Sequence, residues 1–356
     1  MTVLSKEQSR IAYSKANKIL VSASAAAGKT RTLTERVRFL VREGIDPTRL
    51  VVLTFTNHAA EEMRERLNAP DCLFIGTIHS YCARLLNKGG VEIGDALEKQ
   101  EFDKLFSLIN DHLGCVEPVD HLIMDESQDT TGELANFIID VINPKGFSFF
   151  FDPRQQIYGF SGANPARIYE LANDPEVVVY TLKDNYRNAY GILNFARETL
   201  RSLPPLYQDR SHAIRNDMGK VMQINYDPYF IASIIPTKDE FRDWFILCRT
   251  NSQVDSIKAY LEEQGIPVDS FKQSELSRAE LTEKMKRNTV KVLTIHSSKG
   301  LEANNVVVIG ARFWNDEEKR VAYVAATRAR NFLVWMKGKA GRRKSKNVIK
   351  PKMLKW

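Results

Sequence analysis

Cysteine is scarce in this sequence. Its 356 residues include only Cys72, Cys82, Cys115 and Cys248. Four scattered thiols do not make a disulfide framework, and without a C-x-x-C pair they do not predict a zinc site. We therefore expect the protein to reside in a reducing cellular interior.

Long apolar runs are also missing. No stretch approaches the roughly 18 apolar residues of a membrane span, and the first residues, MTVLSKEQSR, are polar, unlike a secretory signal. Hydrophobic residues make up 43% and charged residues 27% of the chain, which argues against wholesale disorder. A chain of 356 residues can form two domains with separate cores.

Acidic residues are absent from the C-terminal end. Residues 337–356 contain nine Lys or Arg and no Asp or Glu, whereas the net charge of the whole chain is +7. The basicity is therefore a tail, and the remaining chain is close to neutral. Such a tail favours polyanions through counterion release, while a merely solvated, disordered end is the other interpretation.

The chain does contain a repeated order of apolar run, polar or small residues, and amphipathic stretch. This order predicts buried strands, each leading into a loop and a helix, and thus a parallel α/β sheet with ligands at the carboxyl ends of its strands. The predicted strands are KILVSAS, LVVLTF, CLFIGT, HLIMDE and FSFFFD, and the predicted helices are TRTLTERVRFLVREG, NHAAEEMRERLN and TTGELANFIIDVI. The order restarts with VVVYTL, DWFILCRT, VKVLTIHS and NNVVVIG. We therefore expect a first domain at 1–174, a second at 175–336 and the tail at 337–356.

Residues 23–30, ASAAAGKT, end like a phosphate-binding loop. The last three, Gly28, Lys29 and Thr30, fit the pattern G-x-x-x-x-G-K-[ST], and the segment lies between a predicted strand and a predicted helix. The backbone N–H groups of such a loop hold phosphates, the lysine binds the β- and γ-phosphates, and the hydroxyl binds Mg²⁺. Alanine replaces the flexible glycine at the earlier positions, which are Ala23, Ala25, Ala26 and Ala27.

The pair Asp125–Glu126 ends the apolar run HLIMDE. Both carboxylates would therefore lie at the end of a strand, where Asp125 can hold Mg²⁺ and Glu126 can polarise an attacking water. An acid pair in isolation is more often a solvated loop. Together with the G-K-T segment, it indicates hydrolysis of a nucleoside triphosphate.

The chain resembles the superfamily 1A DNA helicases of the UvrD/Rep group, whose motifs occur in order over nearly its whole length. The matching segments are LSKEQSRIA, ASAAAGKTRTLTER, LVVLTFTNHAAEEMRERL, GTIHSYCARLL, DESQD, FDPRQQIYGFSGA, LKDNYRN, VKVLTIHSSKGLE and VAYVAATRAR. An alanine at the first loop position is usual in this family. Ala26 and Phe151 stand where the family has glycine, and Ser161 stands where it has arginine.

The resemblance implies two RecA-like domains with an ATP–Mg²⁺ cleft between them. It implies that the catalytic residues are Lys29, Glu126, Gln155, Arg187 and Arg328, the last two as arginine fingers. It places Thr30 and Asp125 on the metal. The implied nucleotide contacts are Gln8, Ala25, Ala26, Ala27, Gly28, Lys29, Thr30, Arg31, Tyr186 and Glu302.

The resemblance also implies a track for single-stranded DNA, gripped without sequence preference by stacking on aromatic rings. The implied contacts are Phe55, Asn57, Thr77, His79, Tyr158, Phe160, Thr294 and His296. Core packing is the alternative for the aromatics. Metal binding is disfavoured for the two histidines, because no Cys, Asp or Glu lies at ligand spacing around them.

The two large inserted subdomains of full-length relatives are nearly missing. The first slot holds only residues 84–118 and the second only 269–288. The leading interpretation is an ATP-dependent DNA helicase or translocase, cytoplasmic and without membrane contact, whose 3′→5′ direction is implied by the family alone. Its tail would add DNA affinity or recruit a protein partner.

Two other interpretations stay open. One is a translocase or repair accessory factor that strips proteins from DNA with little unwinding by itself. The other is a non-enzymatic DNA-binding module with a degenerate ATP site. A strand-displacement assay separates the first from a helicase, and a DNA-stimulated ATPase that Lys29→Ala abolishes would exclude the second.

Overall fold

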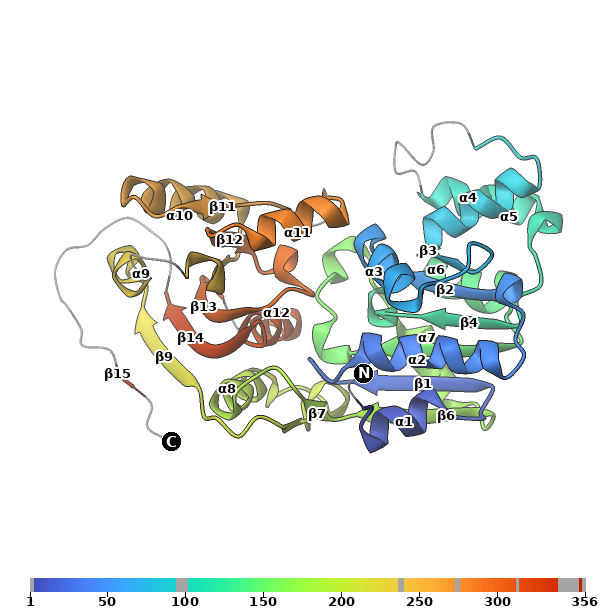
Figure 1. Cartoon of the computed structure of the whole chain (residues 1–356), viewed down its shortest axis with the longest axis horizontal. Helices are drawn as coiled ribbons and strands as arrows, with labels where there is room; N and C mark the ends of the chain where they lie inside the picture. The colour runs from blue at the N-terminus through green and yellow to red at the C-terminus, as the bar shows by residue number, and fades with distance from the viewer. Residues whose placement is uncertain are drawn as a thin grey trace. The chain divides into compact units, whose positions relative to one another are not determined.

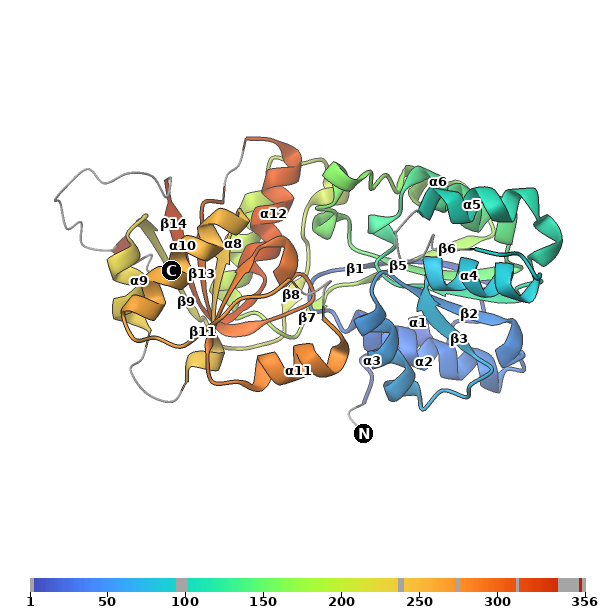
Figure 2. The ribbon, with the colours of Figure 1, turned by 90° about the horizontal axis from the view of Figure 1, so that it is seen from above.

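The computed structural model describes residues 3–93, 102–235, 240–272, 276–311, 314–338 and 352–353. The chain divides into two compact units, the first formed by Met1–Ala23 and Ala27–Leu182, the second by Ser24–Ala26 and Lys183–Trp356. Each unit contains a parallel sheet with helices on both faces (Figures 1 and 2). The predicted α/β class with two parallel-sheet domains is thus confirmed. Most of the basic tail lies outside the described residues.

The first sheet has six parallel strands in the order β3-β2-β4-β5-β1-β6. The predicted strands all form part of it, because each is a short apolar run that is buried on both faces. The strands are β1 (Lys18–Ala23), β2 (Leu50–Thr54), β3 (Phe74–Thr77), β4 (His121–Met124), β5 (Gly146–Phe151) and β6 (Val177–Leu182). The helices are α1 (Lys6–Ala12), α2 (Lys29–Arg42), α3 (Asn57–Leu67), α4 (Ile78–Lys88), α5 (Phe102–Asp111), α6 (Gly132–Asn136) with a π-helical continuation (Phe137–Ile142), and α7 (Ala166–Glu170).

Alternate residues of each strand enter two separate cores. On β1, Ile19 and Val21 pack with α1, α2 and α3, whereas Leu20 packs with α4, α5, α6 and α7. Figure 2 shows these two helix layers on opposite faces of the sheet. A sheet covered on both faces leaves its carboxyl edge as the exposed place for ligands.

The strand Val177–Leu182 differs from the expected domain organisation. It pairs in parallel with β1, so it is the edge strand of the first sheet and not the first strand of the second. The first unit accordingly ends at Leu182, beyond the expected boundary at residue 174. The connection from β5 to β6 contains α7 and passes β1, which lies between these two strands in the sheet. An apolar run alone does not reveal such a crossover.

The second sheet has the order β11-β12-β10-β13-β14-β9-β15, in which only β15 is antiparallel to its neighbour. A separate parallel pair joins β7 (Asp184–Asn185) to β8 (His212–Ala213). The other strands are β9 (Lys220–Asn225), β10 (Trp244–Cys248), β11 (Val268–Asp269), β12 (Val290–Thr294), β13 (Ala303–Ile309), β14 (Ala329–Lys337) and β15 (Lys352–Met353). The helices are α8 (Tyr190–Leu200), α9 (Pro228–Ile234), α10 (Asn251–Glu263), α11 (Arg278–Lys286) and α12 (Asp316–Ala326).

The described residues of the two insertion slots form only a few short elements. The described part of 84–118 contributes the end of α4, the helix α5 and a 3₁₀ turn at Leu113–Cys115. The described part of 269–288 contributes α11. Within the described residues, neither slot holds a subdomain.

A histidine is buried in the first sheet, near the amino edge. His121, the first residue of β4, is fully buried, and its Nε2 lies 2.8 Å from Ser148 Oγ. The Nε of buried Arg36 also donates to Ser148 Oγ, at 3.3 Å, so the serine hydroxyl is left to donate its proton to the histidine ring. Burial, with a further contribution from the Arg36 charge, lowers the pKa of His121 to about 3. The folded protein therefore holds this ring neutral.

We expect His121 to make the protein sensitive to acid. Because its pKa is depressed from 6.5 to about 3 in the folded state, its stabilising contribution is complete above pH 6.5 and is lost as the pH falls. The loss approaches about 1.4 kcal/mol of unfolding free energy per pH unit between those values. Denaturant titrations of wild type and His121→Asn from pH 7 to 4.5 measure how the unfolding free energy changes with pH. Exposed His112→Asn is the matched control and should keep the wild-type slope; equal slopes in wild type and His121→Asn would contradict the assignment.

Candidate active site

The candidate residues of the first unit gather at the carboxyl edge of its sheet, because each follows a different parallel strand. The loop before Lys29 follows β1, Phe55 and Asn57 follow β2, and Thr77 and His79 end β3 and begin α4. Asp125 and Glu126 follow β4, and Gln155, Tyr158 and Phe160 follow β5. The strand-end placement predicted from the sequence is thus observed.

The alanine-rich loop adopts a backbone that usually requires glycine. Ala26 has φ +58° and Gly28 has φ +75°, both left-handed. Helix α2 starts at Lys29, directly after Gly28, which serves as its N-cap. A Cβ at Gly28 would also collide with the Gln8 amide. The helix N-terminus thus opens toward the loop, the arrangement that binds phosphates elsewhere, and Thr30 and the half-buried Arg31 lie in its first turn.

We expect Ala26→Gly to stabilise the protein. A left-handed alanine costs about 1–2 kcal/mol, whereas the added freedom of glycine in the unfolded chain costs about 0.4–1 kcal/mol, so the net gain is about 1 kcal/mol. Ala25→Gly is the matched control: Ala25 has no positive φ and its methyl is buried, so this variant should lose stability through the unfolded-state cost and the lost methyl packing. Thermal and denaturant unfolding of both variants measures the difference. Destabilisation by Ala26→Gly would show that the loop carries no such strain.

Gln8 is tied to the phosphate loop. It forms a capping box with Ser5 at the start of α1, in which Gln8 Oε1 accepts from Ser5 N at 3.0 Å. Its Nε2 donates to Ala27 O at 3.2 Å, and the side chain is buried. Gln8 therefore lies at the loop, where an adenine-reading residue would lie, with its amide held by protein groups.

Lys29 lies between the two predicted acids. Its Nζ is 3.1 Å from Asp125 Oδ1 and also forms an ion pair with Glu126 Oε1. Burial alone would lower the pKa of Lys29, but the two carboxylates outweigh it and raise that pKa. Burial and the Glu126 charge together outweigh Lys29 and raise the pKa of Asp125. The cluster therefore joins one ammonium to two crowded carboxylates.

These residues fit a magnesium ion held jointly with phosphate. No three His, Cys, Asp or Glu side chains gather into a metal cage among the described residues. Mg²⁺ bound to nucleotides needs only one or two protein ligands, because phosphate oxygens and waters supply the others. A buried Asp125 with an excess of negative charge around it suits that ion, and bound Mg²⁺ would neutralise phosphate charge.

A glutamine that the sequence analysis did not single out connects the acid pair to the next strand. Fully buried Gln128 donates from Nε2 to Glu126 Oε2, and its Oε1 accepts from Asp152 N at 2.9 Å. Asp152 Oδ2 in turn accepts from Gln155 Nε2 at 2.7 Å. The DESQD spacing could have indicated Gln128, but its partner Asp152 is adjacent only because β4 and β5 are neighbours.

The aromatic candidates differ in exposure. The rings of Tyr158 and Phe160 lie 6.0 Å apart at 55°, and Phe160 is 71% exposed. Phe55 is partly buried against the core beneath α4, so it also packs within the protein. Asn57 is exposed at the start of α3.

Two identical tetrapeptides, Thr-Ile-His-Ser, follow strands in the two units. Thr77 Oγ1 accepts from Ser80 N at 3.2 Å after β3, and Thr294 Oγ1 accepts from Ser297 N at 3.1 Å after β12. Each threonine therefore caps a turn that presents a half-buried histidine, His79 in one unit and His296 in the other. His79 also lies near the Phe106 ring, with centroids 6.2 Å apart.

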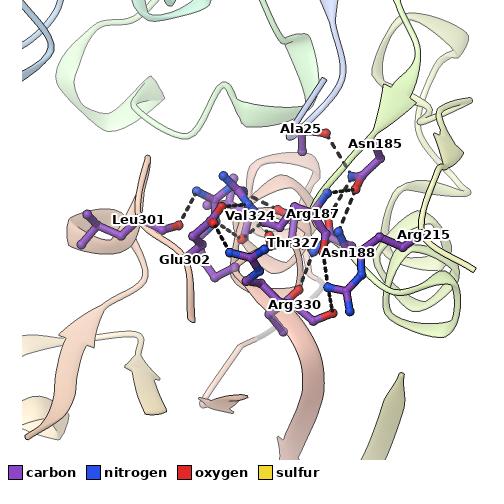
Figure 3. Close-up of polar contacts among 12 residues, drawn as sticks. Ala25, Asn185, Arg187, Asn188, Arg215, Leu301, Glu302, Val324, Thr327 and Arg330 are labelled. Atoms are coloured by element: carbon purple, nitrogen blue, oxygen red, sulfur yellow. Dashed lines mark hydrogen bonds and ion pairs between the residues drawn. The ribbon is translucent and has the colours of Figure 1, made fainter. Parts of the chain in front are cut away.

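The arginine candidates cluster at the amino edge of the second sheet, opposite to the edge that carries Thr294. Figure 3 shows the contacts of Arg187 with Glu302 there. Glu302 directly precedes β13 and Arg328 directly precedes β14. Arg187 forms an ion pair with Glu302 through Nε, and Arg330 pairs with the other Glu302 oxygen at 3.0 Å. Burial would raise the pKa of Glu302, but the charges of Arg187, Arg330 and Arg328 lower it.

Arg328 is almost fully buried. Its guanidinium donates to Val324 O at 2.9 Å, to Leu301 O at 3.2 Å and to Thr327 Oγ1 at 3.2 Å. Tyr186 is 40% exposed. Within the second unit, Tyr186 N donates to Ala26 O at 3.2 Å and Asn185 Nδ2 to Ala25 O at 3.0 Å, the latter drawn in Figure 3.

A parallel sheet with a Gly-Lys-Thr loop after β1, and an acid pair after β4 that contacts the loop lysine, is the arrangement of the phosphate-loop NTPase fold. A family model described as the UvrD/REP helicase N-terminal domain matches residues 4–114, and one described as the UvrD-like helicase C-terminal domain matches residues 269–338. The chain belongs to the UvrD/Rep helicase family.

Curated relatives carry helicase names. The chain is 40% identical over 82 residues to the probable DNA helicase II homolog of Mycoplasma capricolum, a match covering 21% of this chain and 11% of that protein. It is 25% identical over an alignment of 435 residues to the probable DNA helicase of Mycoplasma pneumoniae, covering 88% and 79%. It is 24% identical over 356 residues to the ATP-dependent DNA helicase PcrA of Leuconostoc citreum, covering 70% and 47%. Two of these matches span less than half of the relative's length.

A helix that crosses a membrane needs about 20 mostly apolar residues. No helix in the described part of the chain is both long and apolar enough to cross a membrane.

Proposed function

We propose that this protein is an ATP-dependent motor that moves on single-stranded DNA, in the 3′→5′ direction implied by its family. The observation that carries the proposal is the partly buried ion cluster of Lys29 with Asp125 and Glu126, placed next to the left-handed phosphate loop. A lysine already held by two carboxylates can exchange one of them for phosphate oxygens when a triphosphate enters. The names of the relatives add DNA as the polymer.

Each candidate side chain has a separate role in hydrolysis in this proposal. Lys29 would pair with the β- and γ-phosphates of a bound nucleotide, and Asp125 with Thr30 would hold Mg²⁺. Glu126 accepts the proton of the attacking water at its carboxylate, and Gln155 orients that water. Gln8, Arg31 and Tyr186 bind the adenine, with Glu302 on the ribose; Ala25, Ala26, Ala27 and Gly28 present their N–H groups to phosphate.

Arg187 and Arg328 supply the arginine fingers in this proposal. Closure of the two units around ATP would exchange the Arg187–Glu302 ion pair for phosphate contacts and couple hydrolysis to motion. We expect Arg187→Lys and Arg328→Lys to lower kcat by about 10³-fold, because lysine keeps the charge but lacks the planar fork. Arg201→Lys, at a residue whose side chain is 81% exposed, is the control. Steady-state ATPase assays measure kcat for each variant. A decrease in kcat of less than about threefold would mean that other residues act as the arginine fingers.

In this proposal, DNA contacts lie at the carboxyl edge of each sheet, where the two Thr-Ile-His-Ser turns follow β3 and β12. Thr77, His79, Thr294 and His296 contact phosphates, Asn57 assists them, and Phe55, Tyr158 and Phe160 stack on bases. The repetition of one capped turn in both units supports an equivalent grip in each. The tail 337–356 would add sequence-independent affinity or bind a partner; if its deletion left the salt dependence of DNA binding unchanged, the affinity role would be excluded.

A translocase that unwinds little by itself is the second candidate. The described part of the 269–288 slot contains the end of β11 and the short helix α11, so little is described there that could engage a duplex. We place the protein in the cytoplasm, since its relatives are bacterial helicases and its four cysteines are unpaired.

The deciding experiment is ATPase activity of the full chain with and without single-stranded DNA, beside a strand-displacement assay on a 3′-tailed duplex. Stimulation by DNA with displacement supports a helicase, and stimulation without displacement supports the translocase. If wild type hydrolyses ATP no faster than Lys29→Ala does, only the non-enzymatic DNA-binding module remains as an interpretation.

A further inference from the structure

The carboxylate of Glu126 is held at both oxygens. Lys29, next to the phosphate loop, forms an ion pair with Oε1. Gln128 donates a hydrogen bond from its Nε2 to Oε2. Glu126 itself has a left-handed backbone, with φ +53°, which fixes the direction in which its side chain leaves the strand. When a nucleotide draws Lys29 toward its phosphates, Gln128 is the remaining contact among these three side chains that holds the carboxylate in place.

Gln128 is built into the protein at its other end as well. The side chain is fully buried, so its amide must be satisfied inside the fold. Its oxygen accepts from the backbone N–H of Asp152, which is the first residue after β5. One side chain thus joins the candidate general base to the start of the segment Asp152–Asn164.

That segment is attached to the acid-pair segment at both ends. At its far end, Asn164 N donates to Thr130 O at 2.8 Å, and Ala163 forms an antiparallel bridge with Thr131. Between the two attachments lie Gln155 and the aromatic pair Tyr158 and Phe160. A displacement of the rings by a bound strand would therefore be passed to Asp152, and through Gln128 to Glu126.

We infer that Gln128 is a positioning residue that sets the Glu126 carboxylate for proton abstraction and makes this setting respond to DNA held by the segment Asp152–Asn164. The inference rests on the proposed function, in which Glu126 is the base and Tyr158 and Phe160 contact DNA. It adds a route by which polymer binding regulates hydrolysis, and that route uses a side chain that touches neither ATP nor DNA.

The test uses Gln128→Met in the full chain, which keeps the length of the side chain and removes both hydrogen bonds. With saturating single-stranded DNA, kcat should fall roughly 10- to 100-fold while KM for ATP stays within about twofold, because only the orientation of the base is lost. The stimulation of kcat by DNA should fall as well, with unchanged DNA affinity.

Two further variants keep the result interpretable. Gln128→Leu also removes both hydrogen bonds and buries no charge, so it should show the same loss even if Gln128→Met folds poorly. Gln223→Met, on half-buried Gln223 of β9, is the matched control and should behave as wild type.

The outcomes separate this inference from the proposed function. If wild type hydrolyses ATP and Glu126→Gln abolishes it, but both Gln128 variants keep kcat and DNA stimulation within about twofold of wild type, the inference is wrong and the function stands. A loss of kcat that is equal with and without DNA also overturns the DNA-responsive part. A wild type without ATPase activity overturns both.

Discussion

Replacing Lys29 with alanine is expected to lower kcat/KM for ATP by about 10³-fold or more, because it removes the only proposed cation of the first unit that reaches the β- and γ-phosphates. It should also weaken nucleotide binding, since the loop would retain only backbone N–H groups and the helix N-terminus. Both quantities can be measured by steady-state hydrolysis and by titration with a fluorescent nucleotide.

The same substitution should change stability in a pH-dependent way. Asp125 and Glu126 would lose their common cation in a site where Asp125 is nearly inaccessible. Breaking such a buried pair costs about 3–5 kcal/mol, less whatever Asp125 recovers by taking up a proton. The pKa of Asp125 is already raised, so the penalty should shrink as the pH is lowered, and Asp125→Asn should rescue much of it.

Lys15→Ala is the matched control for the Lys29 variant. Lys15 pairs with Glu43, but its side chain is 73% exposed, so its ion pair is screened by water. We expect wild-type hydrolysis and stability from it. Retention of tight ATP binding by Lys29→Ala would place the triphosphate elsewhere and remove the basis of the proposed site.

Replacing Glu126 with glutamine is expected to lower kcat by about 10²- to 10⁴-fold, the range for loss of a general base. The amide keeps the shape of the side chain but cannot accept a proton. It also releases Lys29 from one ion pair, so nucleotide binding should be retained or become tighter. Single-turnover hydrolysis and nucleotide titration separate the two effects.

Glu133→Gln is the control for the Glu126 variant, because Glu133 is an exposed acid on the same chain segment. It should leave kcat unchanged. If Glu126→Gln lost less than about tenfold in kcat, another group would have to activate the water, and the role of Gln128 would fall with that of Glu126.

The candidate nucleotide site could be proposed from sequence because its parts are local. The phosphate loop, the strand before it and the helix after it are consecutive residues, and the acid pair directly follows an apolar run. The sequence also showed that Ala26 stands where the family has glycine. It did not show the left-handed backbone of Ala26, since φ is set by the path that the loop must follow. The roles of Arg187 and Arg328 came from family resemblance, because no local pattern identifies a finger.

Sequence by itself therefore determined the α/β class, most strand positions and the order of the motifs, because burial pattern and chain direction are properties of short segments. Tertiary structure decided which strand ends are neighbours. The placement of β6 at the edge of the first sheet, the burial of His121 beside Ser148, and the connection of Glu126 to Asp152 through Gln128 all depend on strand order and register. Those contacts join residues that are distant along the chain, and only the packed sheet brings them together.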